Sequence, residues 1–248
     1  MKNISAIIPT HNESKTIAKV INSVRDFVDE VIVVNSCSQD NTAQIAIDAG
    51  AIVIDTYELG KHVAIKSGIM NASGEILVFV DGDWENPDSK TAELLVSGLL
   101  SSPDIKIAKG YYDEANSFTE NGRLTELCAK PLLKIFLSEL ANIKKPLSGE
   151  YAVRRKDLLD MEFAPGFAVD LGILIQCSKK GSVYQVKLNS KIHKHRKLSD
   201  FSLDAIVIAT TIFKNCQIPY NEKILLENLY KEYTQKNIDL NPIPPIKS

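Results

Sequence analysis

Hydrophobic residues in the first half of the chain follow two alternating patterns. Short runs of consecutive apolar residues predict strands buried on both faces, and stretches with apolar residues three and four positions apart predict helices. The predicted strands are residues 4–8, 30–34, 51–54, 76–80 and 105–109, and the predicted helices are residues 13–27, 41–49, 61–71 and 89–100. Such alternation over short connections predicts an α/β fold, a mostly parallel sheet with helices on both faces.

The pattern is less regular in the second half. Helices are predicted at residues 124–140, 170–179, 199–214 and 221–233, and strands at residues 150–153, 183–186 and 190–193. No linker-like segment separates the halves, so we expect one domain over residues 1–240. The proline-rich residues 241–248 are expected to form a flexible tail.

Composition and charge are those of an ordinary globular protein. The 248 residues are 44% hydrophobic and 24% charged, and the formal net charge of −2 gives no bulk attraction to nucleic acid or to an anionic membrane. The longest apolar stretch, residues 205–213, is too short to span a bilayer, and the N-terminus shows no signal-peptide pattern. The cysteines form no Cys-x-x-Cys pair. We therefore expect a cytoplasmic protein without nucleic-acid partners or stable membrane insertion.

Two carboxylates directly follow the strand predicted at residues 76–80. They are Asp81 and Asp83, with Gly82 between them. Open α/β sheets bind ligands at the carboxyl ends of their strands, and two negative charges there are costly unless a cation balances them. A hard divalent metal ion that carries substrate phosphates is the natural balance. An exposed turn would explain the same three residues, so the pattern alone leaves both interpretations open.

Polar residues also follow the first two predicted strands. Helix N-termini at strand ends bind anions and nucleotides, although simple helix capping explains these residues equally well. Lys61 opposes the dipole of the helix that it begins, which suggests contact with a phosphate or a base carbonyl, or else a solvated lysine. The candidate nucleotide-binding residues are Pro9, Thr10, Asn12, Glu13, Asn35, Ser36, Lys61, Asp81 and Gly82. Neither a Gly-x-Gly-x-x-Gly nor a Walker motif is present, which disfavours a nicotinamide enzyme or a P-loop NTPase.

The second half contains candidate residues for a second substrate. Arg123 and Thr125 stand at a predicted helix start and could bind a phosphate or a carboxylate. Asp170 also begins a helix, where capping is the simpler role. His193 could complete a metal site with Asp83, whereas His195 fits a surface histidine. The candidate substrate-binding residues are Lys109, Tyr111, Gly122, Arg123, Leu124, Thr125, Ser148, Gly149 and Glu150.

Together these motifs resemble the glucosyl-3-phosphoglycerate synthases, retaining glycosyltransferases with the GT-A fold. Three first-half motifs resemble many GT-A enzymes: Ile-Pro-x-x-Asn-Glu, Asn-Ser-x-Ser-x-Asp-Asn-Thr and Asp-x-Asp. The second-half motifs resemble this family more specifically. They are Lys109-Gly-Tyr111, Gly122-Arg-Leu-Thr-Glu-Leu127, Lys130-Pro-Leu-Leu133, Pro146-Leu-Ser-Gly-Glu-Tyr-Ala152 and His193-Lys-His195. The resemblance covers about residues 3–215. Lys130 stands where the family usually has Arg. Phe167-Ala-Val-Asp170 replaces its Tyr-Gly-Val-Glu, which shortens the reach of that carboxylate by one methylene.

The resemblance implies a nucleoside diphosphate sugar donor, UDP-glucose before others, and a small anionic acceptor such as 3-phosphoglycerate. Residues 1–110 would form the nucleotide-sugar half and residues 111–240 the acceptor half. Mg²⁺ or Mn²⁺ would be held by Asp83 and His193, and the catalytic set would be Asp83, Asp170 and Arg155. Residues 122–125 would bind the acceptor. Since the leaving phosphate can take the acceptor's proton, a retaining mechanism requires no protein base.

Three alternatives remain open on the sequence. An inverting GT-A transferase acting on polyprenyl phosphate or an envelope glycan would need a positioned carboxylate base and usually a membrane anchor. A nucleotidyltransferase that makes sugar nucleotides would normally carry a Gly-rich basic loop after the first strand, and a catalytically dead module would bind the donor without turnover. The sequence does not choose between UDP-glucose, GDP-mannose and GDP-glucose or fix the acceptor, and only the resemblance suggests a homodimer.

Overall fold

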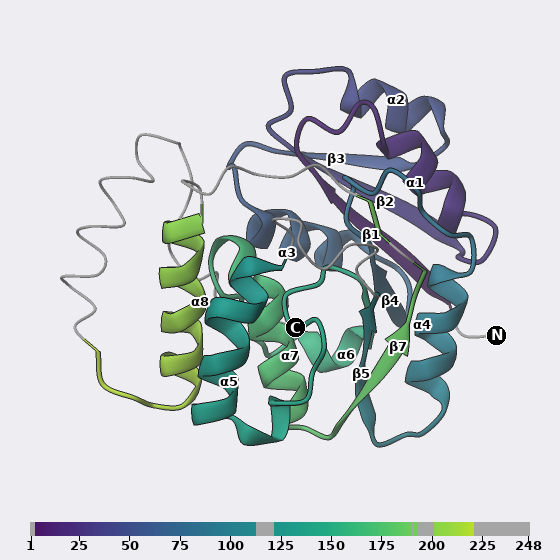
Figure 1. The fold of residues 1–248 in the computed structure, drawn as a ribbon. Coiled ribbons are helices and arrows are strands. Elements are labelled where there is room, and N and C mark those ends of the chain that lie inside the picture. Colours follow the sequence, from purple (N-terminus) through teal and green to yellow (C-terminus); the bar gives the residue numbers. More distant parts are fainter. Residues whose placement is uncertain (1–2, 113–121, 190, 193–200, 221–248) are drawn as a thin grey trace.

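Seven strands form a single sheet in the order β3-β2-β1-β4-β6-β5-β7 (Figure 1). The computed structural model describes residues 3–112, 122–189, 191–192 and 201–220. The strands are β1 (Ile4–Thr10), β2 (Glu30–Ser36), β3 (Ile52–Thr56), β4 (Ile76–Phe79), β5 (Ile105–Tyr111), β6 (Tyr151–Arg154) and β7 (Ser182–Lys187). The α-helices are α1 (Ile17–Val24), α2 (Thr42–Asp48), α3 (Lys61–Asn71), α4 (Thr91–Leu100), α5 (Lys130–Phe136), α6 (Arg155–Leu158), α7 (Val169–Ser178) and α8 (Phe201–Asn215).

The sheet is mostly parallel, with one reversed strand. Neighbouring strands β3, β2, β1 and β4 are parallel, as are β5 and β7. Strand β6 lies between β4 and β5 and is antiparallel to both. The start of β6 therefore lies beside the end of β4, with Tyr151 opposite Phe79.

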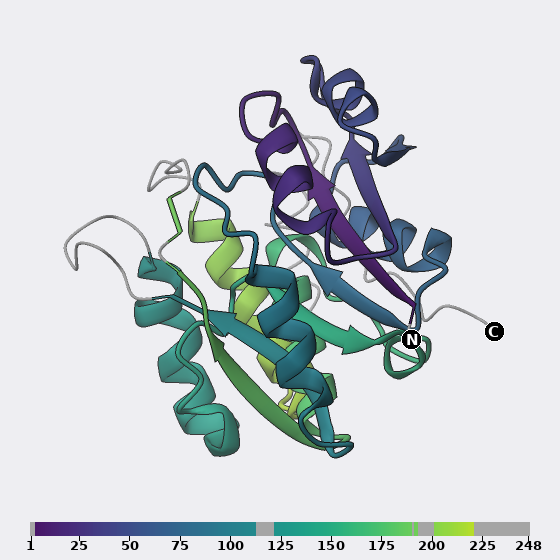
Figure 2. The same ribbon diagram turned by 90° about the vertical axis from the view of Figure 1, so that its right-hand side faces the viewer.

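Helices cover both faces of the sheet because successive strand residues point to opposite sides. Ile8 and Val33 belong to a core beneath α1, α2 and α4, whereas Ile7 and Val34 belong to a second core beneath α3, α5, α7 and α8. In Figure 2, α1 and α4 lie on the viewer's side of the sheet. These layers confirm the fold predicted from the apolar runs.

The helix predicted over residues 124–140 changes its geometry along the chain and has one break, at Leu137. A π-helical turn, η1 (Thr125–Ala129), leads into α5, and a 3₁₀ turn, η2 (Ser138–Leu140), follows it. Pro131 near the start of α5 has no N–H for the preceding turn, and Leu137 leaves the helical region with φ −142° and ψ 66°. The prediction is therefore confirmed up to Phe136 and wrong over residues 137–140, where the helix has ended.

Several predictions fall on residues outside the described ranges. They are the helix at residues 221–233, the tail at residues 241–248, and two residues of the strand predicted at 190–193; the other two, Lys191 and Ile192, are not in a strand. Within the described ranges, none of the helices combines the length and the apolar character that a bilayer crossing would need.

Candidate active site

The turn after β4 lies against the residues that lead into β6. A Cβ atom built at Gly149 would stand 2.0 Å from Oδ1 of Asp81, so only glycine leaves room for this carboxylate. A Cβ atom at Gly82 would likewise stand 2.6 Å from Cγ2 of Thr10, at the end of β1. The two glycines thus allow three chain segments to meet at the carboxyl edge of the sheet.

Two lysines hold the carboxylate of Asp81. The Nζ atom of Lys61, at the start of α3, is 2.6 Å from Oδ1, and the Nζ atom of Lys191 is 2.9 Å from Oδ2. Burial alone would raise the pKa of Asp81, but the two ammonium groups outweigh it and hold that pKa well below its usual range. Asp81 is therefore a fixed anion with both oxygens engaged.

Lys61 also ties the start of α3 to the start of α7. Its Nζ atom is 2.7 Å from Oδ2 of Asp170, whose side chain is only 1% exposed. The neighbouring His62 is fully buried, and its Nδ1 accepts a hydrogen bond from the N–H of Gly166, just before α7. Burial would lower the pKa of Lys61, but Asp170 and Asp81 raise it well above its usual range. Asp170 thus serves as a buried counter-ion of Lys61.

Lys191 is the site residue that the sequence interpretation missed. Its side chain is 3% exposed, and its Nζ atom lies 2.6 Å from Oε1 of Glu150 and 3.5 Å from Oδ1 of Asp83, besides its contact with Asp81. The carboxylates raise its pKa well above the usual range in spite of burial. Its position two residues before His193 was the one sequence feature that could have marked Lys191 as a site residue. Its partner Asp81 is 110 residues away along the chain, so no local motif joins the two.

The cluster has an excess of negative charge. The two lysines contact four carboxylates, those of Asp81, Asp83, Glu150 and Asp170, so that even with the nearby ammonium of Lys109 a formal surplus of one negative charge remains. Oδ1 of Asp83 is buried and makes no hydrogen bond within the described residues. A carboxylate oxygen in that position suits a hard divalent cation. Across the described ranges no three acidic, histidine or cysteine side chains form a complete metal site, and His193 lies outside these ranges.

Lys109 and Ser148 lie beneath the cluster. The ammonium of Lys109, 1% exposed, donates to the carbonyl of Ser148 at 2.6 Å and lies 4.6 Å from the ring centre of Tyr151. Burial lowers the pKa of Lys109 to about 8, and the carboxylate of Asp170 opposes this only in part. The hydroxyl of Ser148 donates to the carbonyl of Gly110 at 2.8 Å. These two side chains join β5 to the segment before β6.

Candidate residues after β1 and β2 form a hydrogen-bonded pair of turns. The N–H of Asn12 donates to Oγ of Ser38, and Oδ1 of Asn12 accepts from the N–H of Gln39. Asn12 has a φ of 59°, a conformation that asparagine tolerates better than most residues. Asn35 donates to Asp55 at 2.7 Å, while its buried Oδ1 has no hydrogen-bond partner in the described part of the chain.

The other candidates of these two turns belong to the same edge. Thr10 is buried and donates to the carbonyl of Val34 at 3.2 Å. Ser36 donates to the carbonyl of Glu58 at 3.2 Å. The N–H of Glu13 donates to Oγ1 of Thr42 at 2.8 Å. Pro9 lies in β1, directly before its last residue, Thr10. These contacts place the candidate nucleotide-binding residues of the two turns at the carboxyl ends of β1 and β2.

Arg155 does not belong to this edge of the sheet. Arg154 pairs with Ile76, the first residue of β4, and the N–H of Arg155 donates to the carbonyl of Glu75 at 2.9 Å. Because β6 is antiparallel to β4, Arg155 lies at the opposite end of the strands from Asp83. Its assignment to the catalytic set is therefore wrong.

Five of the nine candidate substrate-binding residues lie on other elements. Gly122 has a φ of 88°, which favours glycine, and it begins the stretch of Arg123, Leu124 and Thr125 that enters η1 and contacts α8. Tyr111, at the end of β5, lies under the ammonium of Lys144 at 4.0 Å from its ring centre. The candidate substrate-binding residues are thus divided between the cluster, which includes Glu150 with Gly149 and Ser148 beside it, and the elements β5 and η1.

Comparison with known proteins identifies the family. Residues 5–161 match the family model described as glycosyl transferase family 2. The chain belongs to glycosyl transferase family 2. Two similar proteins are glucosyl-3-phosphoglycerate synthases: that of Mycobacterium tuberculosis is 34% identical over 88% of this chain and 75% of its own length. That of Petrotoga mobilis is 35% identical over 95% of this chain and 78% of its own.

Solved structures of the Mycobacterium tuberculosis synthase have a similar fold. The crystal structure of the Mycobacterium tuberculosis synthase with Mn²⁺, UDP-glucose and phosphoglyceric acid has a TM-score of 0.82 and 35% identity, covering 89% of this chain and 81% of that one. Another crystal structure of that synthase contains Mg²⁺ and UDP, with the same TM-score and 34% identity. This family 2 chain is therefore a GT-A hexosyltransferase that resembles the glucosyl-3-phosphoglycerate synthases.

Proposed function

We propose that this glycosyltransferase moves glucose from UDP-glucose to 3-phosphoglycerate, with retention of the anomeric configuration. One observation carries the proposal. The Asp81–Gly82–Asp83 turn belongs to a cluster with a surplus of negative charge, and it follows β4 in a chain that aligns over 89% of its length with a synthase crystallised with Mn²⁺, UDP-glucose and phosphoglyceric acid.

A Mg²⁺ or Mn²⁺ ion fits the charge and the donor atoms of this turn. Asp83, with its buried oxygen that lacks a hydrogen bond, and His193 would hold the ion. When bound, the ion supplies Lewis-acid stabilisation of the charge on the departing diphosphate. Asp81 keeps both oxygens on its lysines and so acts as the neighbour of the metal ligand.

The turns after β1 and β2 would bind the uridine. Asn35 offers a buried carbonyl oxygen that can accept a hydrogen bond from the base, and Glu13, Ser36 and Lys61 line the same edge. Asn12, with Pro9 and Thr10, shapes the turn that receives the nucleotide.

The paired state of the acids favours a retaining reaction. Glu150 is fully buried on Lys191, and Asp170 on Lys61, so neither carboxylate is placed to accept a proton from an acceptor. The bond between C1 of glucose and the diphosphate oxygen breaks, and the acceptor's hydroxyl oxygen bonds to C1 on the same face. The hydroxyl proton passes to the departing phosphate oxygen, so atoms and charge balance without a protein base.

Gly122, Arg123 and Thr125 would hold the acceptor. The guanidinium of Arg123 and the N–H groups at the start of η1 match a phosphate or a carboxylate. Asp170, shorter than the glutamate usual at this position, would act by fixing Lys61.

A UDP-release assay tests the proposal. UDP-glucose, GDP-mannose and GDP-glucose are each combined with 3-phosphoglycerate and with glycerate in Mg²⁺ or Mn²⁺, and the anomer of the product is determined by NMR. We expect turnover with UDP-glucose and 3-phosphoglycerate and an α-linked product. Preference for a GDP-sugar, a β-linked product, or no turnover of any pair would contradict the proposal.

A further inference from the structure

The residues just after Asp83 bind the segment that carries Lys191. The N–H of Glu85 donates to the carbonyl of Ile192 at 2.8 Å, and the N–H of Ile192 donates to Oδ1 of Asn86 at 2.7 Å. These reciprocal bonds fix the backbone on the C-terminal side of Lys191, which is not in a strand.

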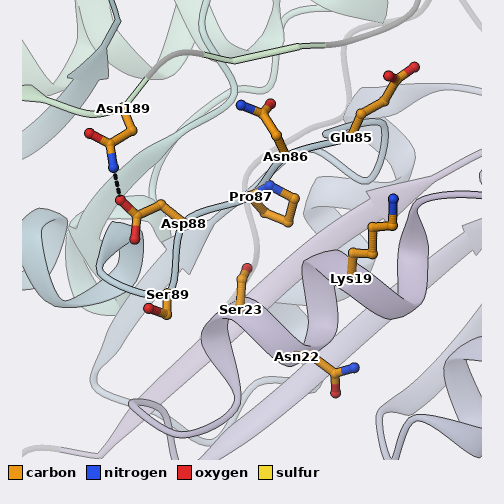
Figure 3. A pocket seen from close by; sticks show the side chains of 9 residues that line it. All are labelled: Lys19, Asn22, Ser23, Glu85, Asn86, Pro87, Asp88, Ser89 and Asn189. Carbon is orange, nitrogen blue, oxygen red and sulfur yellow. Dashed lines mark hydrogen bonds between the residues drawn. The ribbon is translucent and has the colours of Figure 1, made fainter.

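On the other side of Lys191, the side-chain amide of Asn189 donates to a carboxylate oxygen of Asp88, as Figure 3 shows. Asp88 is itself anchored on a helix. Its Oδ1 accepts from the N–H of Lys90 at 2.9 Å, and its carbonyl accepts from the N–H of Thr91, the first residue of α4. Since α4 packs against β5, β6 and β7, Asn189 is held by a part of the core.

Trp84 connects this arrangement to the buried charge. Its indole N–H donates to the same Oδ1 of Asn86 at 3.1 Å, and its fully buried ring lies 5.6 Å from the ammonium of Lys191, within the range of a cation–π contact. Asn86 therefore joins a buried aromatic anchor to the backbone that carries the lysine.

We propose that Trp84, Asn86 and Asp88 form a clamp whose function is to position Lys191 between Asp81, Asp83 and Glu150 for sugar transfer. The lysine has a long flexible side chain, and its three carboxylate contacts require a fixed backbone at residue 191. This role rests on the proposed transferase function. The three residues are positioning residues, since they act through Lys191.

The groove beside the clamp supplies a matched control. Across it, Lys19, Asn22 and Ser23 of α1 line the opposite wall, and the side chain of Asn22 points away from the clamp (Figure 3). Asn86→Ala removes the shared acceptor, Asn86→Asp retains an oxygen in its place, and Asn22→Ala makes the same truncation on the opposite wall. We expect kcat/KM to fall about tenfold in Asn86→Ala, the size of one lost hydrogen bond. Asn86→Asp and Asn22→Ala should remain within about threefold of the wild type.

A double-mutant cycle shows whether Asn86 acts through the lysine. In a Lys191→Met background, Asn86→Ala should change kcat/KM by less than about twofold, because the group that it positions is gone. An equal tenfold loss in both backgrounds would overturn the clamp. Thermal unfolding of each variant separates this effect from a general loss of stability.

Tryptophan fluorescence provides a readout that does not depend on turnover. Trp84 is the only tryptophan of the chain, so its emission reports on the clamp directly. We expect a shifted emission maximum in Asn86→Ala and in Lys191→Met, and wild-type emission in Asn86→Asp and Asn22→Ala. Unchanged emission in Asn86→Ala would overturn the proposal. A wild-type enzyme that fails to turn over UDP-glucose would contradict the proposed function, while the fluorescence result would still decide the clamp.

Discussion

Replacing Lys61 with methionine tests the electrostatic account of the site. Its ammonium is within 2.7 Å of Asp170 and 2.6 Å of Asp81. Asp81 keeps Lys191 in the variant, but Asp170, 1% exposed, loses the lysine that it contacts and keeps only the weaker influence of Lys109 among the charges that lower its pKa. Removing one partner of a buried ion pair costs about 3–5 kcal/mol. Because Asp81 stays paired, we expect Lys61→Met to lower the free energy of unfolding by about 3 kcal/mol at neutral pH, and to abolish transfer.

The sign of the pH dependence follows from Asp170. Burial raises the pKa of this carboxyl, and loss of the lysine raises it further, so the folded variant binds a proton that the unfolded chain releases. The stability of the variant is then greatest in acid and falls as the pH rises through the window between the unfolded and folded pKa values. The gap to the wild type should widen with rising pH between the folded pKa of Asp170 in the wild type and its higher folded pKa in the variant, by up to roughly 1.4 kcal/mol per pH unit.

Urea denaturation at several pH values measures both effects. Lys66→Met, on the same helix, is the matched control and should change stability by less than about 0.5 kcal/mol. Asp170→Asn in the Lys61→Met background removes the unbalanced charge and should recover at least about 1 kcal/mol without restoring transfer. A cost below about 1 kcal/mol for Lys61→Met, or no recovery in the double variant, would refute the buried counter-ion reasoning.

Three other changes probe separate parts of the site. Asp83→Asn keeps the size of the side chain but removes the negative charge of a proposed metal ligand. We expect kcat to fall at least about 100-fold and Mn²⁺ no longer to tighten UDP binding in calorimetry. Metal-dependent turnover near that of the wild type would contradict the metal assignment. Arg123→Ala should raise the KM for 3-phosphoglycerate about tenfold or more, for a lost charge-assisted bond, with the donor KM unchanged; a rise in the donor KM alone would move Arg123 to the donor half. Lys109 carries a depressed pKa of about 8, so its burial penalty is present below that pH and disappears above it. The stability of the wild type relative to Lys109→Met should therefore rise by roughly 2 kcal/mol between about pH 8 and pH 9.5, and a constant difference across this range would show that Lys109 is not a buried ammonium.

The apolar runs predicted the first half of the fold well because each of its strands is a local, continuous signal. Strand β4 and helix α3 coincide closely with the predicted residues 76–80 and 61–71. The reversed strand β6 was predicted as a strand but not as antiparallel, since four apolar or mixed residues carry no information about direction. Its direction is nonetheless decisive, because it brings Gly149 and Glu150 to Asp81 and takes Arg155 away.

The site was predictable where its residues are close in sequence. Asp81 and Asp83 follow one strand and could be found together, whereas Lys191 meets them only through the tertiary fold. Glu150 and Asp170 were expected to touch substrate or orient its hydroxyls, and the structure gives each of them a buried lysine instead. Burial depends on the whole fold, so a motif can identify such a residue without showing what it contacts.

The lysine pairs also explain why two similar carboxylates can differ in role. Asp81 has an ammonium on each oxygen and lies against Gly149. A metal ion could bind Asp81 only by displacing one of these lysines, and a short ion pair would then be lost. Asp83 has a single lysine at 3.5 Å and a buried oxygen with no hydrogen bond among the described residues, so it gains more from a cation. A ligand binds where the charge is least balanced, and the structure places that imbalance on Asp83. The clamp of Trp84, Asn86 and Asp88 would maintain it, because Lys191 shifted towards Asp83 would neutralise the carboxylate that the metal ion needs.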